Sequence, residues 1–204
     1  MLIDTHCHIQ FNAYKDDYDA VIKKCLDKGM VLNLVGTQKD TSRWAVEMAE
    51  KYENVYATIG THPIHLHPTH VDEEETHFMT REEGFDEPYY EELARSEKVI
   101  GVGECGLDLF HVPKDKSVEE VLEKQKDVFL AHYDFARKHE LTLVVHCREA
   151  HEQMIHLLKS EISNQKSANP ITNYRLQITD IKSKINGVIH CFTGTKAEAL
   201  AYPP

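Results

Sequence analysis

The sequence has no run of apolar residues long enough to span a membrane, which takes about 20 residues. Its N-terminus also lacks the basic and apolar segments of a signal peptide, because Asp4 interrupts the short apolar start. Its five cysteines, an odd number, show no Cys-x-x-Cys spacing, which indicates a reducing compartment rather than a disulfide framework. We therefore expect a cytoplasmic protein that does not associate with membranes.

Positive charge is also scarce: 23 Lys and Arg stand against 34 Asp and Glu, which gives a net charge of −11. This balance argues against a module that binds nucleic acid through a broad basic surface. It does not exclude a phosphoester substrate, because bound divalent ions can reverse the field of a site. With 204 residues, 41% of them hydrophobic, the chain can form one sizeable core, and we expect a single domain over residues 1–204.

What the sequence does contain is a pair of histidines, His6 and His8, directly after the apolar residues 1–3. Side chains two apart on a strand point to the same side, so both imidazoles can reach one metal ion. Surface or capping histidines are the alternative interpretation of the pair alone.

Further apolar runs end in residues that can also bind metal. They are residues 99–103 before Glu104, residues 141–145 before His146, residues 187–189 before His190, and residues 55–59, which open into Gly60-Thr61-His62-Pro63. Short buried strands with a polar residue at the C-terminal end are typical of the catalytic face of a parallel α/β barrel. We therefore expect these side chains to converge.

Helical patterns alternate with the apolar runs. We expect a further strand at residues 30–35 and helices near residues 18–26, 41–52, 89–95, 118–139 and 151–159. Repeated βα units imply a parallel sheet with right-handed crossovers. Two stretches interrupt this alternation: we expect residues 66–88 to form an acidic loop at the barrel mouth and residues 160–184 a surface insertion on the opposite face.

Four cysteines each directly follow one of the candidate ligands: Cys7, Cys105, Cys147 and Cys191. If the ligands face the barrel mouth, the alternation of a strand turns each cysteine toward the surrounding helices, where a thiol acts as a small hydrophobe. We expect Cys25 to lie on a helix.

Five motifs, in this order, resemble those of the TatD family of metal-dependent hydrolases. They are Asp4-Thr5-His6-Cys7-His8, Gly60-Thr61-His62-Pro63, Gly103-Glu104-Cys105-Gly106-Leu107-Asp108, His146-Cys147-Arg148-Glu149-Ala150 and Gly187-Val188-Ile189-His190-Cys191-Phe192-Thr193-Gly194. The resemblance extends to about Thr195. It implies a TIM (β/α)8-type barrel and a divalent-metal nuclease, a deoxyribonuclease-like hydrolase that usually removes nucleotides from DNA or RNA ends.

The resemblance also implies roles for single residues. His6 and His8 would bind a first metal ion, and His146 and His190 a second. Glu104 would bridge both ions and is the expected catalytic carboxylate. Histidine and carboxylate ligands suit zinc or manganese, with magnesium possible. Two such ions would activate water and neutralise charge that builds on phosphoryl oxygens.

Three more residues are expected to contact substrate. His62 resembles the family histidine that helps to hold the substrate phosphate. Arg148 and Asp108 would contact the substrate or support the metal ligands from behind.

The resemblance ends before the last part of the family pattern. Family members continue through two more strands, with an aspartate that completes the first metal site. A full barrel takes about 250 residues, so we expect this chain to lack about the last two βα units. The strands near Leu2 and Val188 would then be edges that favour self-association.

Two other functions stay open. One is a non-catalytic remnant that binds metal without turnover. The other is an amidohydrolase that acts on C–N bonds, which is disfavoured because Glu104 occupies the position of that group's common bridging lysine.

Overall fold

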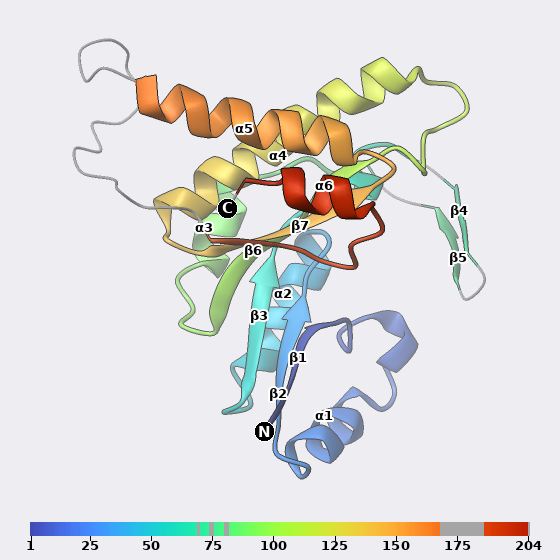
Figure 1. Ribbon diagram of the computed structural model, residues 1–204. Coiled ribbons are helices and arrows are strands. Elements are labelled where there is room, and N and C mark those ends of the chain that lie inside the picture. The colour runs from blue at the N-terminus through green and yellow to red at the C-terminus, as the bar shows by residue number, and fades with distance from the viewer. Residues whose placement is uncertain (69, 74–75, 80–81, 168–185, 204) are drawn as a thin grey trace.

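The computed structural model describes residues 1–68, 70–73, 76–79, 82–167 and 186–203, and its centre is a six-stranded sheet in which every neighbouring pair is parallel. The strands, in their order across the sheet, are β1 (Leu2–Cys7), β2 (Met30–Val35), β3 (Val55–Ile59), β6 (Val99–Asp108), β7 (Thr142–Arg148) and β8 (Gly187–Ile189). Their order in the sheet is also their order in the chain. Figure 1 shows that the sheet curls strongly between β3 and β6.

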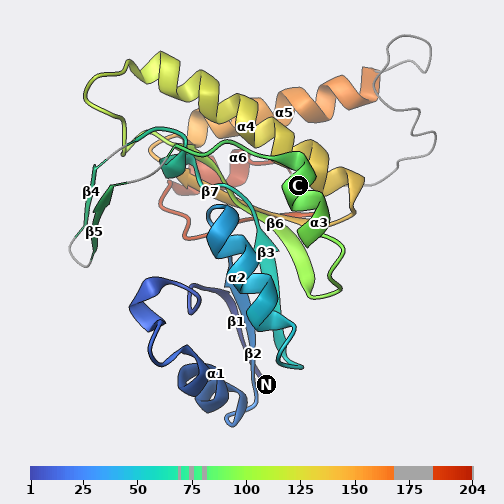
Figure 2. The ribbon, with the colours of Figure 1, turned by 180° about the vertical axis from the view of Figure 1, so that it is seen from behind.

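A helix follows each of these strands in the chain. The helices are α1 (Tyr18–Leu26), α2 (Lys39–Ala49), α3 (Glu87–Leu93), α4 (Val118–Lys138), α5 (His151–Ser167) and α6 (Lys196–Ala201). Figure 2 shows α2 lying against β2 and β3 on the side away from the viewer of Figure 1. The βα alternation confirms the predicted α/β barrel-type architecture. None of the helices described is long and apolar enough to cross a membrane.

The start of a helix is fixed by side-chain caps at several places. Ser117 accepts a hydrogen bond from the backbone N–H of Glu120 at the start of α4, and Asp86 accepts one from Tyr89 at the start of α3. Such caps satisfy backbone donors that the first turn leaves unpaired. The first of these helices, α4, makes its main contact with the sheet on β6, whereas α3 contacts α2.

The hydrophobic core lies between the sheet and these helices. Leu32 and Leu34 of β2 are fully buried together with Ile22 of α1 and Ala45 of α2. Larger side chains fill the space under α3 and α4: Tyr90, Phe129, Tyr133 and Phe135. The helices α1 to α5 therefore each contribute apolar side chains to one continuous core, whereas α6 has no buried residue.

The cysteines follow the predicted orientation in part. Cys105 and Cys147 are buried in the core, and Cys7 packs against its edge. Cys25 lies on α1 as expected. Cys191 is exposed, so the prediction is wrong there, because β8 ends at Ile189 and the strand alternation no longer applies.

The region between β3 and α3 differs from the predicted loop. It contains an antiparallel hairpin of β4 (His70–Glu73) and β5 (Thr76–Met79), which extends away from the rest of the molecule (Figure 1). The charged composition conceals these strands, since it shows no apolar alternation. In the second irregular stretch, α5 continues to Ser167 rather than ending near Lys159, and residues 168–184 lie outside the described residues.

Glu104 lies inside β6 rather than at its end. The pairing of β6 with β3 ends at Val102, whereas its pairing with β7 continues to Asp108. Glu104 is therefore placed where β6 extends beyond β3. Glycine permits the close approach to β7: a Cβ on Gly106, whose φ is +155°, would lie 1.9 Å from the carbonyl oxygen of His146.

The first and last strands of the described sheet each have one neighbour. β1 pairs with β2 and β8 with β7, while no described strand joins β1 to β8. Leu2 is 62% exposed and Val188 is 48% exposed. Within the described part of the chain, the sheet is thus open between these two edges.

Candidate metal site

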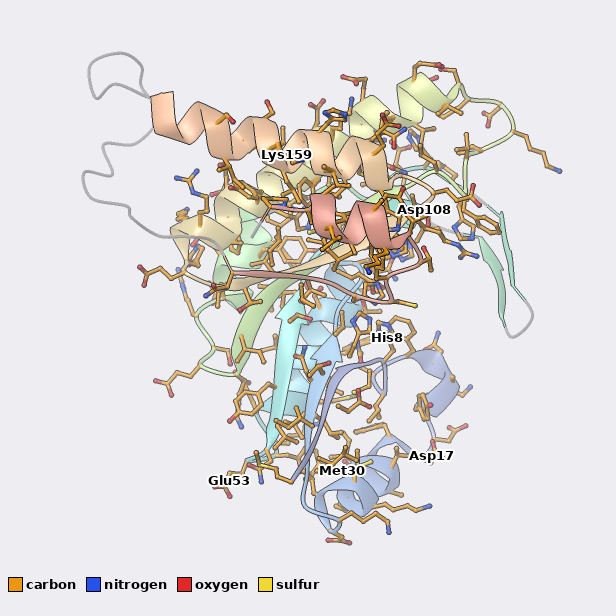
Figure 3. The ribbon with its side chains drawn as sticks, in the orientation of Figure 1. His8, Asp17, Met30, Glu53, Asp108 and Lys159 are labelled. Atoms are coloured by element: carbon orange, nitrogen blue, oxygen red, sulfur yellow. The ribbon has the colours of Figure 1, made fainter. Side chains whose placement is uncertain are left out.

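Five histidines and one glutamate meet where the parallel strands end. His6 is in β1 and His8 follows it, His62 follows β3, Glu104 is in β6, His146 is in β7 and His190 follows β8. In Figure 3, His8 and Asp108 lie at this end of the sheet, while Met30 and Glu53 mark the opposite end. The carboxyl ends of parallel strands share one edge, which explains how residues far apart in sequence converge here.

The carboxylate of Glu104 is the centre of the cluster, and the residue is only 4% exposed. Its Oε1 lies 3.0 Å from His146 Nδ1, 3.3 Å from His62 Nε2 and 2.5 Å from His190 Nε2. Its Oε2 lies 3.2 Å from His6 Nε2. Burial alone would raise the pKa of Glu104, but the charge of His62 and hydrogen bonds from the other histidines hold it well below its usual value. The carboxylate is therefore ionised.

Two groups of side chains bring their ligand atoms close enough to hold a metal ion. They are His6, Glu104 and His190, and His62, Glu104 and His146, with the atoms of each group within 4.8 Å of one another. Glu104 belongs to both groups, as a bridging ligand would. The grouping differs from the predicted pairs, since His190 stacks on His6 with ring centroids 4.1 Å apart. Which ion each histidine serves therefore stays a prediction.

His8 lies at the margin of the cluster. Its Nε2 is 3.2 Å from His6 Nε2 and 3.9 Å from Glu104 Oε2. Its Nδ1 donates a hydrogen bond to the carbonyl oxygen of Val35 at 2.8 Å, which leaves Nε2 unprotonated. Burial lowers the pKa of His8, so the neutral imidazole that a metal requires is favoured. Imidazole nitrogens around a shared carboxylate fit a divalent ion such as zinc or manganese.

Asp108 lies behind His146, on the side away from Glu104. Its Oδ2 accepts hydrogen bonds from His146 Nε2 at 3.0 Å and His111 Nδ1 at 2.9 Å. Burial alone would raise the pKa of Asp108, but the hydrogen bonds from both histidines hold it far below its usual value. Two roles were predicted for Asp108, contact with substrate or support of a metal ligand. Its hydrogen bond to His146 favours the second role, because this bond orients the His146 ring.

His146 is held between two carboxylates. Burial alone would lower its pKa, but hydrogen bonds to Asp108 and Glu104 raise the pKa of His146 to about 9. The end of β6 is itself fixed by Gln125 of α4, which accepts from the backbone N–H of Asp108 and donates to its carbonyl oxygen. The sequence motifs gave no signal for His111 or Gln125, whose contacts arise only from the tertiary structure.

Arg148 ends β7 near this cluster. Its guanidinium lies over the ring of Phe110, 3.7 Å from the ring centroid. This stacking orients a cation near the strand ends. Contact with substrate stays a prediction for both Arg148 and His62.

The turn that carries His62 is held by a buried histidine, His132 of α4. The backbone N–H of Thr61 donates to His132 Nε2 at 2.9 Å, and His132 Nδ1 donates to the carbonyl oxygen of Val128 at 2.7 Å. Burial lowers the pKa of His132 to about 4, so the ring is neutral at neutral pH. Its position within a helix gave no sequence signal for this role.

The fold and the cluster together define the class of protein, an α/β barrel-type protein with a candidate metal centre at the C-terminal ends of its strands. Comparison with known proteins specifies the family. The family profile described as "TatD related DNase" matches residues 3–203. The chain therefore belongs to the TatD family.

Individual relatives agree with this assignment. The chain is similar to the Uncharacterized metal-dependent hydrolase YabD of Bacillus subtilis, 32% identical over 96% of this chain and 62% of the relative. It is 26% identical to the 3'-5' ssDNA/RNA exonuclease TatD of Escherichia coli K12, over 98% of this chain and 63% of the relative. The crystal structure of YjjV, a TatD homolog from E. coli K12, matches with a TM-score of 0.66 at 23% identity, over 98% of this chain and 63% of that chain. That structural likeness shows the fold, and the chain spans less than two thirds of the length of these relatives.

The neutral His132 gives the folding stability a defined pH dependence. The unfolded chain takes up a proton at this histidine below about pH 6.5, whereas the folded protein does so only near pH 4. The stability that depends on this difference is fully present above pH 6.5 and is lost as the pH falls toward 4. Between pH 7 and pH 5 we expect wild type to lose about 2 kcal/mol more unfolding free energy than His132→Gln, measured by urea denaturation.

The matched control is His156→Gln, because the His156 side chain on α5 is exposed. This variant should follow the wild-type pH profile. If the His132→Gln profile also followed it, His132 would not be neutral in the folded protein.

Proposed function

We propose that this protein is a metal-dependent hydrolase that cleaves phosphodiester bonds at the ends of DNA or RNA. The observation that carries the proposal is the buried, ionised Glu104, which is shared by two groups of histidines. The name of the E. coli relative, a 3'-5' ssDNA/RNA exonuclease, supports the substrate class. The centre would hold two divalent ions, of zinc, manganese or magnesium.

In the proposed site, His6 and His8 would hold the first ion, His146 and His190 would hold the second, and Glu104 would serve both. When bound, such ions generate a nucleophile from water at neutral pH and stabilise negative charge on the phosphoryl group. Asp108 keeps the His146 ring in place through the hydrogen bond at Nε2. The negative charge of Glu104 would attract both ions.

The substrate would lie across His62 and Arg148. Burial and the charge of His146 lower the pKa of His62, and its Nδ1 accepts a hydrogen bond from the backbone N–H of Ile64. Nε2 is thereby directed toward Glu104, 3.3 Å away, at the centre of the cluster.

A non-catalytic metal-binding protein is the second candidate. The observation in its favour is that the histidines differ in their carboxylate partners. His146 contacts both Asp108 and Glu104. Among the described carboxylates, only Glu104 lies near the Nε2 atoms of His6 and His8. An ion at His6 and His8 would then bind more weakly than one at His146. Binding without turnover is the expected behaviour of this candidate.

Removal of Glu104 tests the ligand assignment. We expect Glu104→Ala to lose both ions, from about two per chain to near zero, because one carboxylate serves two positions. His62→Ala should keep its metal and bind substrate more weakly. Metal content is measured by plasma mass spectrometry, with the exposed Glu123→Ala on α4 as the control. Loss of an ion from His62→Ala would instead assign His62 as a ligand, as its distance from Glu104 permits.

A nuclease assay tests the function itself. The purified 204-residue chain is expected to release nucleotides from the 3′ end of a labelled single-stranded DNA in the presence of manganese, and to stop when EDTA is added. The Glu104→Ala variant should be inactive under both conditions. Metal binding without any release of nucleotides would favour the non-catalytic candidate.

Self-association is a further expectation from the two open edges. Unpaired strands present free backbone donors and acceptors that pair with other chains, and a charged side chain on an edge suppresses this pairing. We expect the 204-residue chain to form dimers or larger species in light scattering, and Val188→Lys on β8 to reduce their mass. Ile100→Lys is the control, since Ile100 is 42% exposed but lies on β6, which has neighbours on both sides. A wild-type chain that stays monomeric at all concentrations would contradict the expectation.

A further inference from the structure

A pocket of about 280 Å³ lies between the segment that follows β1 and the helices α1 and α2. Its volume is close to the lower end of the roughly 300–1,000 Å³ found for small-molecule sites. In Figure 3, His8 and Asp17 mark the beginning and the end of the segment that forms one wall. The lining residues that matter here are Gln10, Phe11, Lys15, Tyr18, Trp44 and Lys51.

Three of these residues give the pocket aromatic walls. Phe11, Tyr18 and Trp44 come from the segment after β1, from α1 and from α2, respectively. All three are half-buried, so part of each ring remains accessible. Aromatic rings around an open pocket suit a flat ligand that stacks, as nucleic-acid bases do on aromatic side chains.

The inner wall carries an unsatisfied hydrogen-bond acceptor. Gln10 is 4% exposed, and its Nε2 donates to the carbonyl oxygen of Val35 at 2.7 Å. Because a carbonyl oxygen accepts only from a donor, this contact fixes the orientation of the amide. Its Oε1 is buried and has no hydrogen-bond partner among the described residues. This oxygen has almost no accessible surface, so it is not open to a ligand, and Gln10 serves as a fixed inner wall of the pocket.

The rim of the pocket has a positive balance. Lys15 and Lys51 are exposed, and Lys51 Nζ lies 5.8 Å from the centre of the Tyr18 ring. Glu47 also lines the pocket, and Arg43 lies 3.9 Å from its carboxylate. Two lysines against one partly neutralised carboxylate favour a ligand that carries phosphate.

The pocket and the candidate metal site share a wall. The Phe11 ring stacks on the His8 ring with centroids 4.5 Å apart and an angle of 21° between the planes. Gln10 and His8 also donate to the same carbonyl oxygen, that of Val35. A ring stacked on the remaining face of Phe11 would lie about 4.5–7 Å farther from His8. This separation suits a base and a phosphate of the same nucleic-acid strand.

We propose that this pocket binds a nucleobase of the strand whose phosphodiester bond is cleaved at Glu104. The base stacks against Phe11 and Trp44, and Lys51 attracts its phosphate. The inference rests on the proposed function for its substrate, and it adds the residues that would hold the terminal base.

Trp44 is the one tryptophan of the sequence, so its fluorescence reports on this pocket directly. The probe is adenosine 5′-monophosphate, titrated in EDTA so that no turnover takes place. We expect saturable quenching by this nucleotide, and none by ribose 5-phosphate or inorganic phosphate, which lack a base. Absence of quenching by the nucleotide, or equal quenching by ribose 5-phosphate, would overturn the proposal.

Variants separate the contributions. Phe11→Leu removes the stacking ring but keeps an apolar side chain, and should weaken nucleotide binding about tenfold. Lys51→Ala, at an exposed position, should weaken it about threefold and reduce its dependence on salt. Lys28→Ala, an exposed lysine outside the pocket, is the matched control and should bind as wild type does. Unchanged binding in both Phe11→Leu and Lys51→Ala would refute the assignment.

The outcome is independent of the nuclease assay. Quenching by the nucleotide in a chain that releases no nucleotides would support the pocket and refute the proposed function. Metal-dependent nuclease activity without quenching would support the function and refute the pocket.

Discussion

One ionised carboxylate, that of Glu104, determines how the other groups at its end of the sheet are arranged. A charge that is 4% exposed needs hydrogen-bond donors or cations around it, because burial without them costs several kcal/mol. Four imidazole nitrogens within 3.3 Å supply them here, from His6, His62, His146 and His190. Each belongs to a different strand end, so this carboxylate connects β6 to β1, β3, β7 and β8. The cost of burying it explains why so many histidines gather at one edge.

This arrangement also sets requirements on the backbone. Glu104 and His146 lie on adjacent strands, and the approach of β6 to β7 leaves no room for a side chain at Gly106. On the other side, a Cβ on Gly60 would lie 2.8 Å from the backbone of Gly103. The glycines that flank the ligands therefore fix strand spacing, which in turn fixes the distances between the ligand atoms.

The sequence predicted most of the strands and the convergence of the candidate ligands for a simple reason. Each apolar run ends in one polar residue, and the C-terminal ends of parallel strands meet at one edge. The grouping of the histidines was not predictable, because it depends on ring orientation and on the curl that stacks His190 on His6. The β4–β5 hairpin has no apolar alternation to reveal it. Gln10 and His111 lie outside any motif, and their importance depends on which partners the folded chain brings to them.

The stacking of His6 on His190 has a consequence for the order in which this protein can form during synthesis. The His6 ring belongs to the first strand of the described sheet and His190 directly follows the last, so their contact closes a loop that contains most of the chain. Contacts between residues so far apart in sequence form late and slow folding, because loop closure must precede any gain from the contact. A ribosome-bound chain can build β1, β2 and β3 early, since these strands are neighbours in sequence and in space. It has no complete histidine cluster until residue 190 has left the exit tunnel. Until then Glu104 lacks one of the partners that compensate its charge, and of the two groups of candidate ligands only His62, Glu104 and His146 can assemble.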